Sequence, residues 1–251
     1  MTQSGGKFAL VTGTSSGIGA ATAHALIESG WQVAGVARRG APFVDQRYEH
    51  IVADLGDRTM LQMIEPRIEE RLRAEHWRRV GLVNNAALPG LLGPIERLDL
   101  DALSQVFAVN VVAPVWSMGL FARFAPADAP LRVVNVSTGA AVRAFAGLGA
   151  YSASKAALRM AGMVFAAERE LPTSGEQRDM RVLSYEPGTV DTPMQEHART
   201  SSRDVLPSVE MFVGFAARGA LVSPTEPSAE IVEFLESGPG EVFQERRLGG
   251  R

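Results

Sequence analysis

The sequence predicts an α/β fold in which helices cover both faces of one parallel sheet, a doubly wound arrangement. Short apolar segments alternate with helical patterns along the chain, an order typical of parallel strands joined by crossover helices. A glycine-rich turn follows the first apolar segment, and polar residues follow several of the later ones. Ligands bind beyond the carboxyl ends of the strands in such sheets, so these residues are expected to share one site.

The composition favours a single domain over residues 1–251. Of the 251 residues 46% are hydrophobic, enough for a substantial core, and no Pro/Gly/Ser linker divides them. A net charge of -3 argues against nucleic acid or an anionic membrane as a partner. Without Cys there is no thiolate metal site or nucleophile, and no metal centre is expected. The polar N-terminus and the lack of an uninterrupted apolar run long enough to cross a bilayer predict a cytoplasmic protein.

The first strand is predicted over residues 8–12, and the glycine-rich turn after it leads into a helix over residues 20–28. Backbone N–H groups in such a turn approach a pyrophosphate closely, and the helix N-terminus adds its dipole. The spacing is GxxxGxG rather than GxGxxG, and a plain chain reversal is the alternative. Its position directly after the first strand favours phosphate binding. The residues assigned to this site are Gly13, Ser15, Ser16, Gly17, Ile18 and Gly19.

The second predicted strand, residues 32–37, ends at a pair of arginines, Arg38 and Arg39. In a dinucleotide-binding fold an Asp or Glu at this strand end binds the free 2′-hydroxyl of the adenosine ribose. Here the residue is Ala37, and guanidinium groups suit a 2′-phosphate, so NADP(H) is predicted rather than NAD. Either arginine is alternatively a solvated loop residue, and Arg38 is the firmer of the two assignments.

The third predicted strand, residues 50–53, follows with too little room for a full crossover helix, which predicts a loop or a stunted helix. Asp54 and Leu55 at its end are placed to touch the adenine, although Asp54 is equally suited to cap the next helix. A fourth strand over residues 80–83 precedes Asn85 and Ala86. Small residues there let the chain pass beside a cofactor, and an Asn amide can brace neighbouring strands.

A long apolar helix is predicted over residues 101–124, with Asn110 among apolar neighbours. A buried amide must find partners or destabilise the fold, so its plainest role is to brace the helix near a kink before Pro114. A strand over residues 131–136 then ends at Ser137 and Thr138, whose hydroxyls either bind local backbone or face the site.

Tyr151 and Lys155 lie four residues apart in a helical pattern over residues 151–170, so they share one face of the helix. A positive charge beside a phenol favours the phenolate and lowers its pKa from the usual value of ~10 toward neutral pH. Such a pair also occurs on ordinary amphipathic helices, so by itself it does not distinguish a catalytic pair from a structural one.

The rest of the chain predicts a surface loop over residues 171–179, a strand over 180–185, a helix over 228–236 and a strand over 241–244. Residues 187–192 follow the end of a strand. Residues 193–222, with several Met and Phe side chains, form either a helical lid over a pocket or a peripheral helix pair.

Together these motifs resemble the short-chain dehydrogenase/reductase family over nearly the whole chain. The motifs are Thr12 to Gly19, Asn84-Asn85-Ala86-Ala87, Asn110, Ser137-Thr138, Tyr151 to Lys155 and Pro187 to Thr192. The resemblance implies a Rossmann-type fold with a single NADP-binding domain. It also implies a catalytic tetrad of Asn110, Thr138, Tyr151 and Lys155. Ser137, Pro187 and Gly188 would lie beside the cofactor, and Val190 and Thr192 would hold the nicotinamide carboxamide.

Within the family, residues 181–195 resemble the sepiapterin reductase and bacterial benzil reductase branch. Four residues depart from the usual pattern. Thr138 replaces a second Ser, and its extra methyl stiffens χ1. Ala87 replaces a Gly, Glu186 precedes Pro187 where a neutral residue is usual, and Pro193 stands where pterin-reducing relatives carry a polar or acidic residue. The expected substrate is therefore a ketone or dicarbonyl rather than a pterin.

The expected reaction is NADPH-dependent reduction of a carbonyl to an alcohol, with Tyr151 as proton donor and Thr138 bonded to the carbonyl oxygen. Lys155 would lower the Tyr151 pKa and hold the ribose hydroxyls, and Asn110 would position a water. The alternatives are an NAD-dependent alcohol dehydrogenase and a non-catalytic NADPH-sensing protein. The helices of Asn110 and Lys155 have outward apolar faces, which predict a homodimer or homotetramer.

Overall fold

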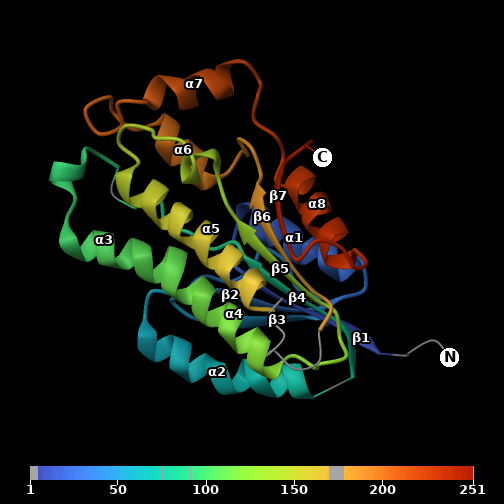
Figure 1. The fold of residues 1–251 in the computed structure, drawn as a ribbon. Coiled ribbons are helices and arrows are strands. Elements are labelled where there is room, and N and C mark those ends of the chain that lie inside the picture. Colours follow the sequence, from blue (N-terminus) through green and yellow to red (C-terminus); the bar gives the residue numbers. More distant parts are fainter. Residues whose placement is uncertain (1–4, 75, 91, 170–177, 251) are drawn as a thin grey trace.

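The computed structural model describes residues 5–74, 76–90, 92–169 and 178–250. Within these residues the centre of the molecule is one seven-stranded sheet in the order β3-β2-β1-β4-β5-β6-β7 (Figure 1). Every neighbouring pair of strands is parallel. The strands are β1 (Gly6–Thr12), β2 (Gln32–Ala37), β3 (Tyr48–Val52), β4 (Trp77–Asn84), β5 (Leu131–Val136), β6 (Met180–Glu186) and β7 (Phe243–Arg247).

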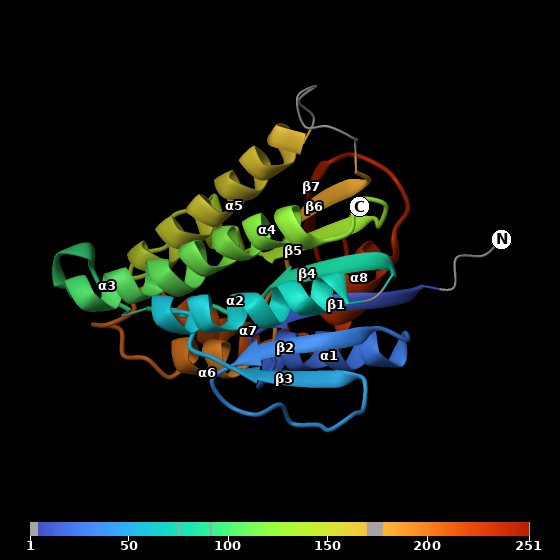
Figure 2. The same cartoon turned by 90° about the horizontal axis from the view of Figure 1, so that it is seen from below.

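Helices cover both faces of this sheet, which confirms the doubly wound, Rossmann-type α/β arrangement. On one face lie α2 (Arg58–Arg73), α3 (Leu100–Phe107), α4 (Ala113–Phe124) and α5 (Gly149–Arg169), and Figure 2 shows α2, α4 and α5 side by side. On the other face lie α1 (Gly17–Glu28) and α8 (Thr225–Glu236), which pack against each other. At the carboxyl ends of the strands stand α6 (Pro193–Arg199) and α7 (Val209–Ala217).

Alternate residues of each strand enter two separate cores, as the period of two along a strand requires. Leu10, Leu82 and Val133 pack toward the α2, α4 and α5 face. Their neighbours Val83 and Val134 pack toward α1 and α8. Because both faces are covered, the central strands are apolar throughout, which is why the sequence shows them as continuous runs.

The predicted strands over residues 32–37 and 131–136 have the bounds of β2 and β5. The connection from β2 to β3 contains no helix, as its length predicted. The last strand was misplaced by the sequence prediction, since β7 runs Phe243–Arg247 rather than 241–244. It is an edge strand with charged, half-exposed residues, so hydrophobicity does not mark its end. Most of the predicted loop over 171–179 lies outside the described residues, as does residue 170 at the end of the predicted helix.

The long apolar helix runs Leu100–Phe124 and contains a π-helical segment, η2 (Ala108–Val112), between α3 and α4. By length and composition alone it could cross a membrane, although Ser104, Gln105 and Asn110 interrupt its apolar residues. Half of its apolar window is buried within the protein. Leu120 and Phe121 are fully buried in the core beneath α4, so the apolar character of this helix is explained by packing.

Candidate active site

A cavity of about 710 Å³ opens at the carboxyl ends of the strands. It collects nearly all the site residues that the sequence predicted, although these come from seven different segments of the chain. Of that set, Gly19 and Asn110 do not line it. The predicted residues that line the cavity are Gly13, Ser15, Ser16, Gly17, Ile18, Arg38, Arg39, Asp54, Leu55, Asn85, Ala86, Ser137, Thr138, Tyr151, Lys155, Pro187, Gly188, Val190 and Thr192.

The glycine-rich turn between β1 and α1 needs glycine for conformation and for space. Gly13 and Gly17 have φ angles of 77° and 57°, in the left-handed region that favours glycine. At Gly19 an added Cβ would lie 2.3 Å from the Gly13 carbonyl oxygen and 2.4 Å from Asn85 Nδ2. Gly19 therefore packs against the backbone of the turn and against Asn85, and it does not face the cavity. The glycines of this turn fit a phosphate-binding turn at the N-terminus of a helix.

Asn85 and Thr12 hold the start of this turn against the end of β4. Asn85 Nδ2 donates to the Thr12 carbonyl at 2.9 Å, and the backbone N–H groups of Asn85 and Ala86 both donate to Thr12 Oγ1 at 3.0 Å. Beside them Asn84 Nδ2 donates to Asn135 Oδ1 at 2.8 Å, which joins β4 to β5. The predicted bracing of neighbouring strands by Asn amides is therefore present.

At the far end of the cavity Arg38 faces Asp54 across the ends of β2 and β3. Their closest charged atoms, Arg38 Nη1 and Asp54 Oδ2, are 3.7 Å apart, and the Arg38 side chain is 62% exposed. Asp54 Oδ1 also accepts the Gly56 N–H at 2.9 Å. The cap of α2 is Asp57, whose carboxylate accepts from Thr59 and Met60, so Asp54 does not cap that helix. Arg38 remains available to an anionic group in the cavity.

Asn110 is completely buried within the π-helical segment η2. Its Oδ1 accepts the Leu88 N–H at 2.8 Å, and its Nδ2 donates to the Leu88 carbonyl at 2.9 Å and to Ser154 Oγ at 3.0 Å. The side chain thus ties the segment after β4 to α5, one residue before Lys155. Its visible contacts are those of a bracing residue.

Ser137 and Thr138 continue β5 into the cavity. The Ser137 N–H donates to the Tyr185 carbonyl at 2.6 Å, which holds the chain beside β6. Thr138 Oγ1 accepts the Ala140 N–H at 3.3 Å and so starts the short 3₁₀ helix η3 (Gly139–Ala141). A hydroxyl that accepts from the backbone keeps its own proton free to donate into the cavity.

Tyr151 and Lys155 lie together on α5 at the base of the cavity, with Lys155 Nζ 5.9 Å from the centre of the Tyr151 ring. Lys155 Nζ donates to the Val136 carbonyl at 2.7 Å. Burial lowers the pKa of Lys155 from 10.5 to about 8. Burial also raises the pKa of Tyr151 from 10.0 to about 12, opposite to the lowering that the sequence analysis expected from Lys155.

Residues 187–192 pass the cavity between β6 and α6. Thr192 caps α6 by accepting the Gln195 N–H at 3.3 Å, and its methyl group is the nearest neighbour of a Cβ placed at Gly17, at 3.2 Å. Val190 is buried and forms an isolated parallel bridge with Val222. The segment thereby closes over the glycine-rich turn.

The remaining cavity wall is mostly apolar and includes Leu92, Phe145, Met194, Phe212 and Phe215. The last three belong to residues 193–222, so this segment borders the cavity.

Three charged residues of the cavity, Arg143, Glu186 and Arg247, were not predicted as site residues. Glu186 was noted only as a departure from the usual family pattern, and the signal for Arg143 was its position five residues after Thr138. Arg247 lies beyond the predicted end of the last strand.

The parallel sheet, the glycine turn and the strand-end cavity define a dinucleotide-binding protein of the Rossmann type. The family model described as short chain dehydrogenase matches residues 7–203. The chain belongs to this short-chain dehydrogenase/reductase family, whose members are oxidoreductases that use nicotinamide cofactors.

Named relatives point to one branch of the family. Benzil reductase ((S)-benzoin forming) of Bacillus subtilis is 31% identical over 236 residues, covering 91% of this chain and 93% of the relative. Sepiapterin reductase of Bos taurus is 35% identical over 173 residues, covering 66% of this chain and 60% of the relative. A solved short-chain dehydrogenase/reductase of Saccharomyces cerevisiae has a TM-score of 0.81 at 25% identity, covering 96% of each chain. The predicted family and branch are therefore confirmed.

Proposed function

We propose that this protein is an NADPH-dependent reductase that converts a ketone or dicarbonyl to an alcohol. The main support for this proposal is that Tyr151, Thr138 and Lys155 line one cavity. The glycine-rich turn and several apolar side chains line the same cavity. The relatives named benzil reductase support a dicarbonyl substrate.

When bound, NADPH would supply the hydride that reaches the carbonyl carbon. Tyr151 gives its proton to the carbonyl oxygen, and a pKa of about 12 keeps the phenol protonated at neutral pH. Thr138 donates a hydrogen bond to the same oxygen as negative charge develops there. Lys155 holds the ribose hydroxyls of the cofactor, and Asn110 acts as a positioning residue through the segment after β4 and through Ser154.

The cofactor assignment rests on the end of β2. Ala37 offers no carboxylate to a ribose hydroxyl, and Arg38 and Arg39 line the cavity next to it. A 2′-phosphate would bind Arg38 in place of its long, exposed contact with Asp54. Gly13, Ser15, Ser16, Gly17 and Ile18 would hold the pyrophosphate, with Asp54, Leu55, Asn85 and Ala86 along the adenosine and ribose. Val190, Thr192, Pro187 and Gly188 would hold the nicotinamide end.

Residues 193–222 act as the substrate lid in this proposal, within one domain over residues 1–251 that works in the cytoplasm. We also propose a homodimer or homotetramer formed through the outer faces of α4 and α5. Val115 on α4 and Met160 and Val164 on α5 are large apolar residues that are between 42% and 54% exposed. Light scattering at micromolar concentration should give a multiple of the chain mass, and the mass of one chain would contradict this.

The central test is Tyr151→Phe, assayed by NADPH consumption with benzil, 1-phenyl-1,2-propanedione and simple ketones. Removing the phenol proton donor should lower kcat by at least about 100-fold, the usual contribution of general acid catalysis. NADPH binding, followed by fluorescence, should change little because the ring remains. Substantial turnover by the variant would refute the role of Tyr151. Wild-type turnover only with NAD⁺ and alcohols would favour the oxidising dehydrogenase, and binding without turnover would favour the sensor.

A further inference from the structure

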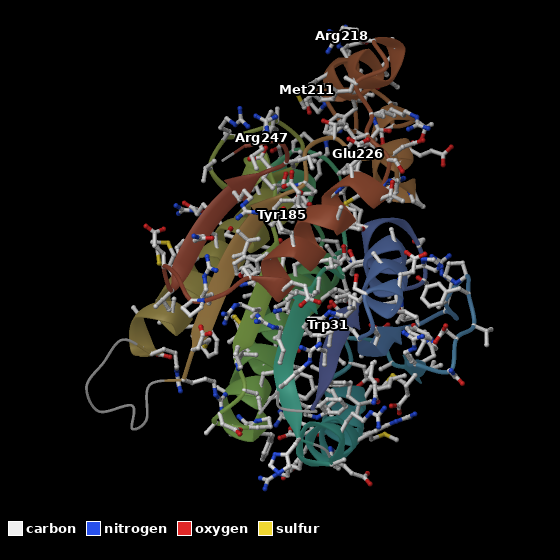
Figure 3. All side chains as sticks on the ribbon, turned by 90° about the vertical axis from the view of Figure 1, so that its right-hand side faces the viewer. Trp31, Tyr185, Met211, Arg218, Glu226 and Arg247 are labelled. Atoms are coloured by element: carbon white, nitrogen blue, oxygen red, sulfur yellow. The ribbon has the colours of Figure 1, made fainter. Side chains whose placement is uncertain are left out.

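Arg143, Glu186 and Arg247 form a charged cluster on the cavity wall, outside the predicted tetrad. Glu186 and Arg247 face each other in the pairing of β6 with β7, with Arg247 Nε 3.5 Å from Glu186 Oε1. Arg143 reaches the same carboxylate oxygen from the segment after η3, at 3.6 Å. Figure 3 shows Arg247 at the end of the molecule that carries Met211 and Arg218 of α7, away from Trp31.

The cluster lies close to the proposed reaction centre. An added Cβ at Gly139 would be 2.5 Å from Arg143 Nη2 and 3.0 Å from Glu186 Oε1. Gly139 directly follows Thr138, so the guanidinium of Arg143 crosses the backbone next to the hydroxyl that would hold the substrate carbonyl. Because Gly139 carries no side chain, the ends of both charged side chains can pack directly against its backbone. The cluster therefore adjoins the residue that follows Thr138.

The cluster also carries an excess of positive charge. Two guanidinium groups share the single carboxylate of Glu186, and the described residues offer them no second ion pair. Arg143 and Arg247 are 58% and 63% exposed, whereas Glu186 is only 25% exposed. The carboxylate is thus committed to the protein while both cations present free N–H donors. A guanidinium with free donors is the protein group best suited to bind a carboxylate with two parallel hydrogen bonds.

The same cavity is also lined by the apolar side chains of Met194, Phe212 and Phe215. A substrate whose carbonyl lies at Tyr151 and Thr138 therefore shares the cavity with both positive charge and apolar side chains.

We propose that the Arg143–Glu186–Arg247 cluster selects ketones that carry a carboxylate near the carbonyl and an apolar group beyond it, such as aryl 2-keto acids. Arg143 binds the carboxylate directly, and Arg247 supports it by competing for Glu186. This rests on the proposed carbonyl reduction, in which the keto group gains the hydride and the Tyr151 proton while NADPH is oxidised. The carboxylate itself takes no part in the transfer.

The experiment compares benzoylformate with its neutral methyl ester, two substrates with the same phenyl ketone that differ in one charge. With NADPH, wild type should show a kcat/KM for benzoylformate about tenfold or more above that for the ester. Arg143→Met should lower this ratio by about tenfold or more, mainly through KM. Glu186→Gln should raise the ratio, because it frees both guanidinium groups.

Arg67→Met is the matched control. Arg67 is also an exposed arginine, paired with Glu49 at 2.6 Å, but it lies on α2 and does not line the cavity. It changes the net charge of the protein equally and should keep the wild-type ratio. The melting temperatures of the Arg143→Met and Arg67→Met proteins should stay close to that of the wild type, because both arginine side chains are more than half exposed.

A wild-type preference for the ester, or equal ratios in wild type and Arg143→Met, would overturn the proposal. So would reduction of 1-phenyl-1,2-propanedione without reduction of benzoylformate. If wild type reduces no carbonyl compound at all, the proposed function fails. The anion site is then tested by fluorescence titration of the NADPH complex with benzoate, where weaker binding by Arg143→Met supports the cluster and equal binding refutes it.

Discussion

The Gly19→Ala variant tests whether the turn requires glycine for steric reasons as well as for its backbone conformation. Gly19 is the third residue of α1, where its backbone is helical. Helix propensity alone predicts that alanine there stabilises the fold by about 0.5–1 kcal/mol. The structure predicts the opposite sign, because the new Cβ would lie 2.3 Å from the Gly13 carbonyl oxygen and 2.4 Å from Asn85 Nδ2.

The destabilisation by the added methyl group depends on how easily its neighbouring atoms can move. The Gly13 oxygen belongs to the backbone, and Asn85 is held by its bond to the Thr12 carbonyl, so neither can shift freely. Forcing an extra methyl group into a packed site costs about 1–3 kcal/mol. Because the displaced atoms form the turn itself, NADPH binding should weaken by about 10- to 100-fold, at 1.4 kcal/mol per tenfold.

The assays are urea denaturation for the free energy of unfolding and fluorescence titration for the NADPH dissociation constant. Gly214→Ala is the matched control, since it is a helical glycine in α7 whose nearest neighbour is the flexible end of Arg218 at 2.8 Å. It should leave stability unchanged or slightly higher. A Gly19→Ala protein that is as stable as wild type and binds NADPH equally well would refute the spatial argument.

Two further predictions concern charge. Arg38→Ala should raise the NADP dissociation constant about tenfold or more and leave NAD binding nearly unchanged, because a charge-assisted bond to the 2′-phosphate is lost. An unchanged NADP preference in paired titrations would contradict the assignment. Between pH 8 and 9, folding stability should rise, since Lys155 has released its proton in the folded protein at a pKa of about 8 but still binds it when unfolded at 10.5. Lys155→Met should reduce that rise in urea denaturation series, and an equal rise in both proteins would exclude Lys155 as its source.

Much of the candidate site could be predicted because parallel strands bring their carboxyl ends to one edge. Gly13, Arg38, Asn85 and Thr138 are far apart in the sequence, yet each directly follows or nearly follows a strand, and the cavity gathers all four. Apolar runs located the strands, so the strand ends located the residues. No contact between side chains had to be known.

Arg143 and Arg247 could not be predicted in this way, because their position depends on packing. Arg247 meets Glu186 through the pairing of β6 with an edge strand that ends in three consecutive charged residues, so hydrophobicity does not mark its end. Arg143 reaches Glu186 by crossing Gly139, and a sequence cannot indicate in which direction a loop arginine turns. Asn110 itself was predicted as a site residue. Its hydrogen-bond partners, Leu88 and Ser154, were not, because their positions relative to Asn110 depend on the π-helical segment that contains it.

The sequence also predicted the Tyr151–Lys155 pair but not the balance between its two opposing effects. A charge 5.9 Å from the ring stabilises a phenolate by about 3 kcal/mol at an effective dielectric of 20. The rise of the Tyr151 pKa from 10.0 to about 12 through burial also corresponds to about 3 kcal/mol. Burial therefore prevails at Tyr151, and this order of the two effects cannot be predicted from spacing alone, because burial is set by the whole fold.

The raised pKa of Tyr151 bears on how the proposed reaction depends on pH. A Tyr151 that keeps its proton at neutral pH can act as a donor in each turnover, as carbonyl reduction requires. Alcohol oxidation by the same group would require the phenolate, which is only a small fraction of Tyr151 at neutral pH when the pKa is about 12. The rate of any oxidising activity should therefore increase as the pH rises, whereas the equilibrium direction is set by the substrates and the cofactor and not by Tyr151.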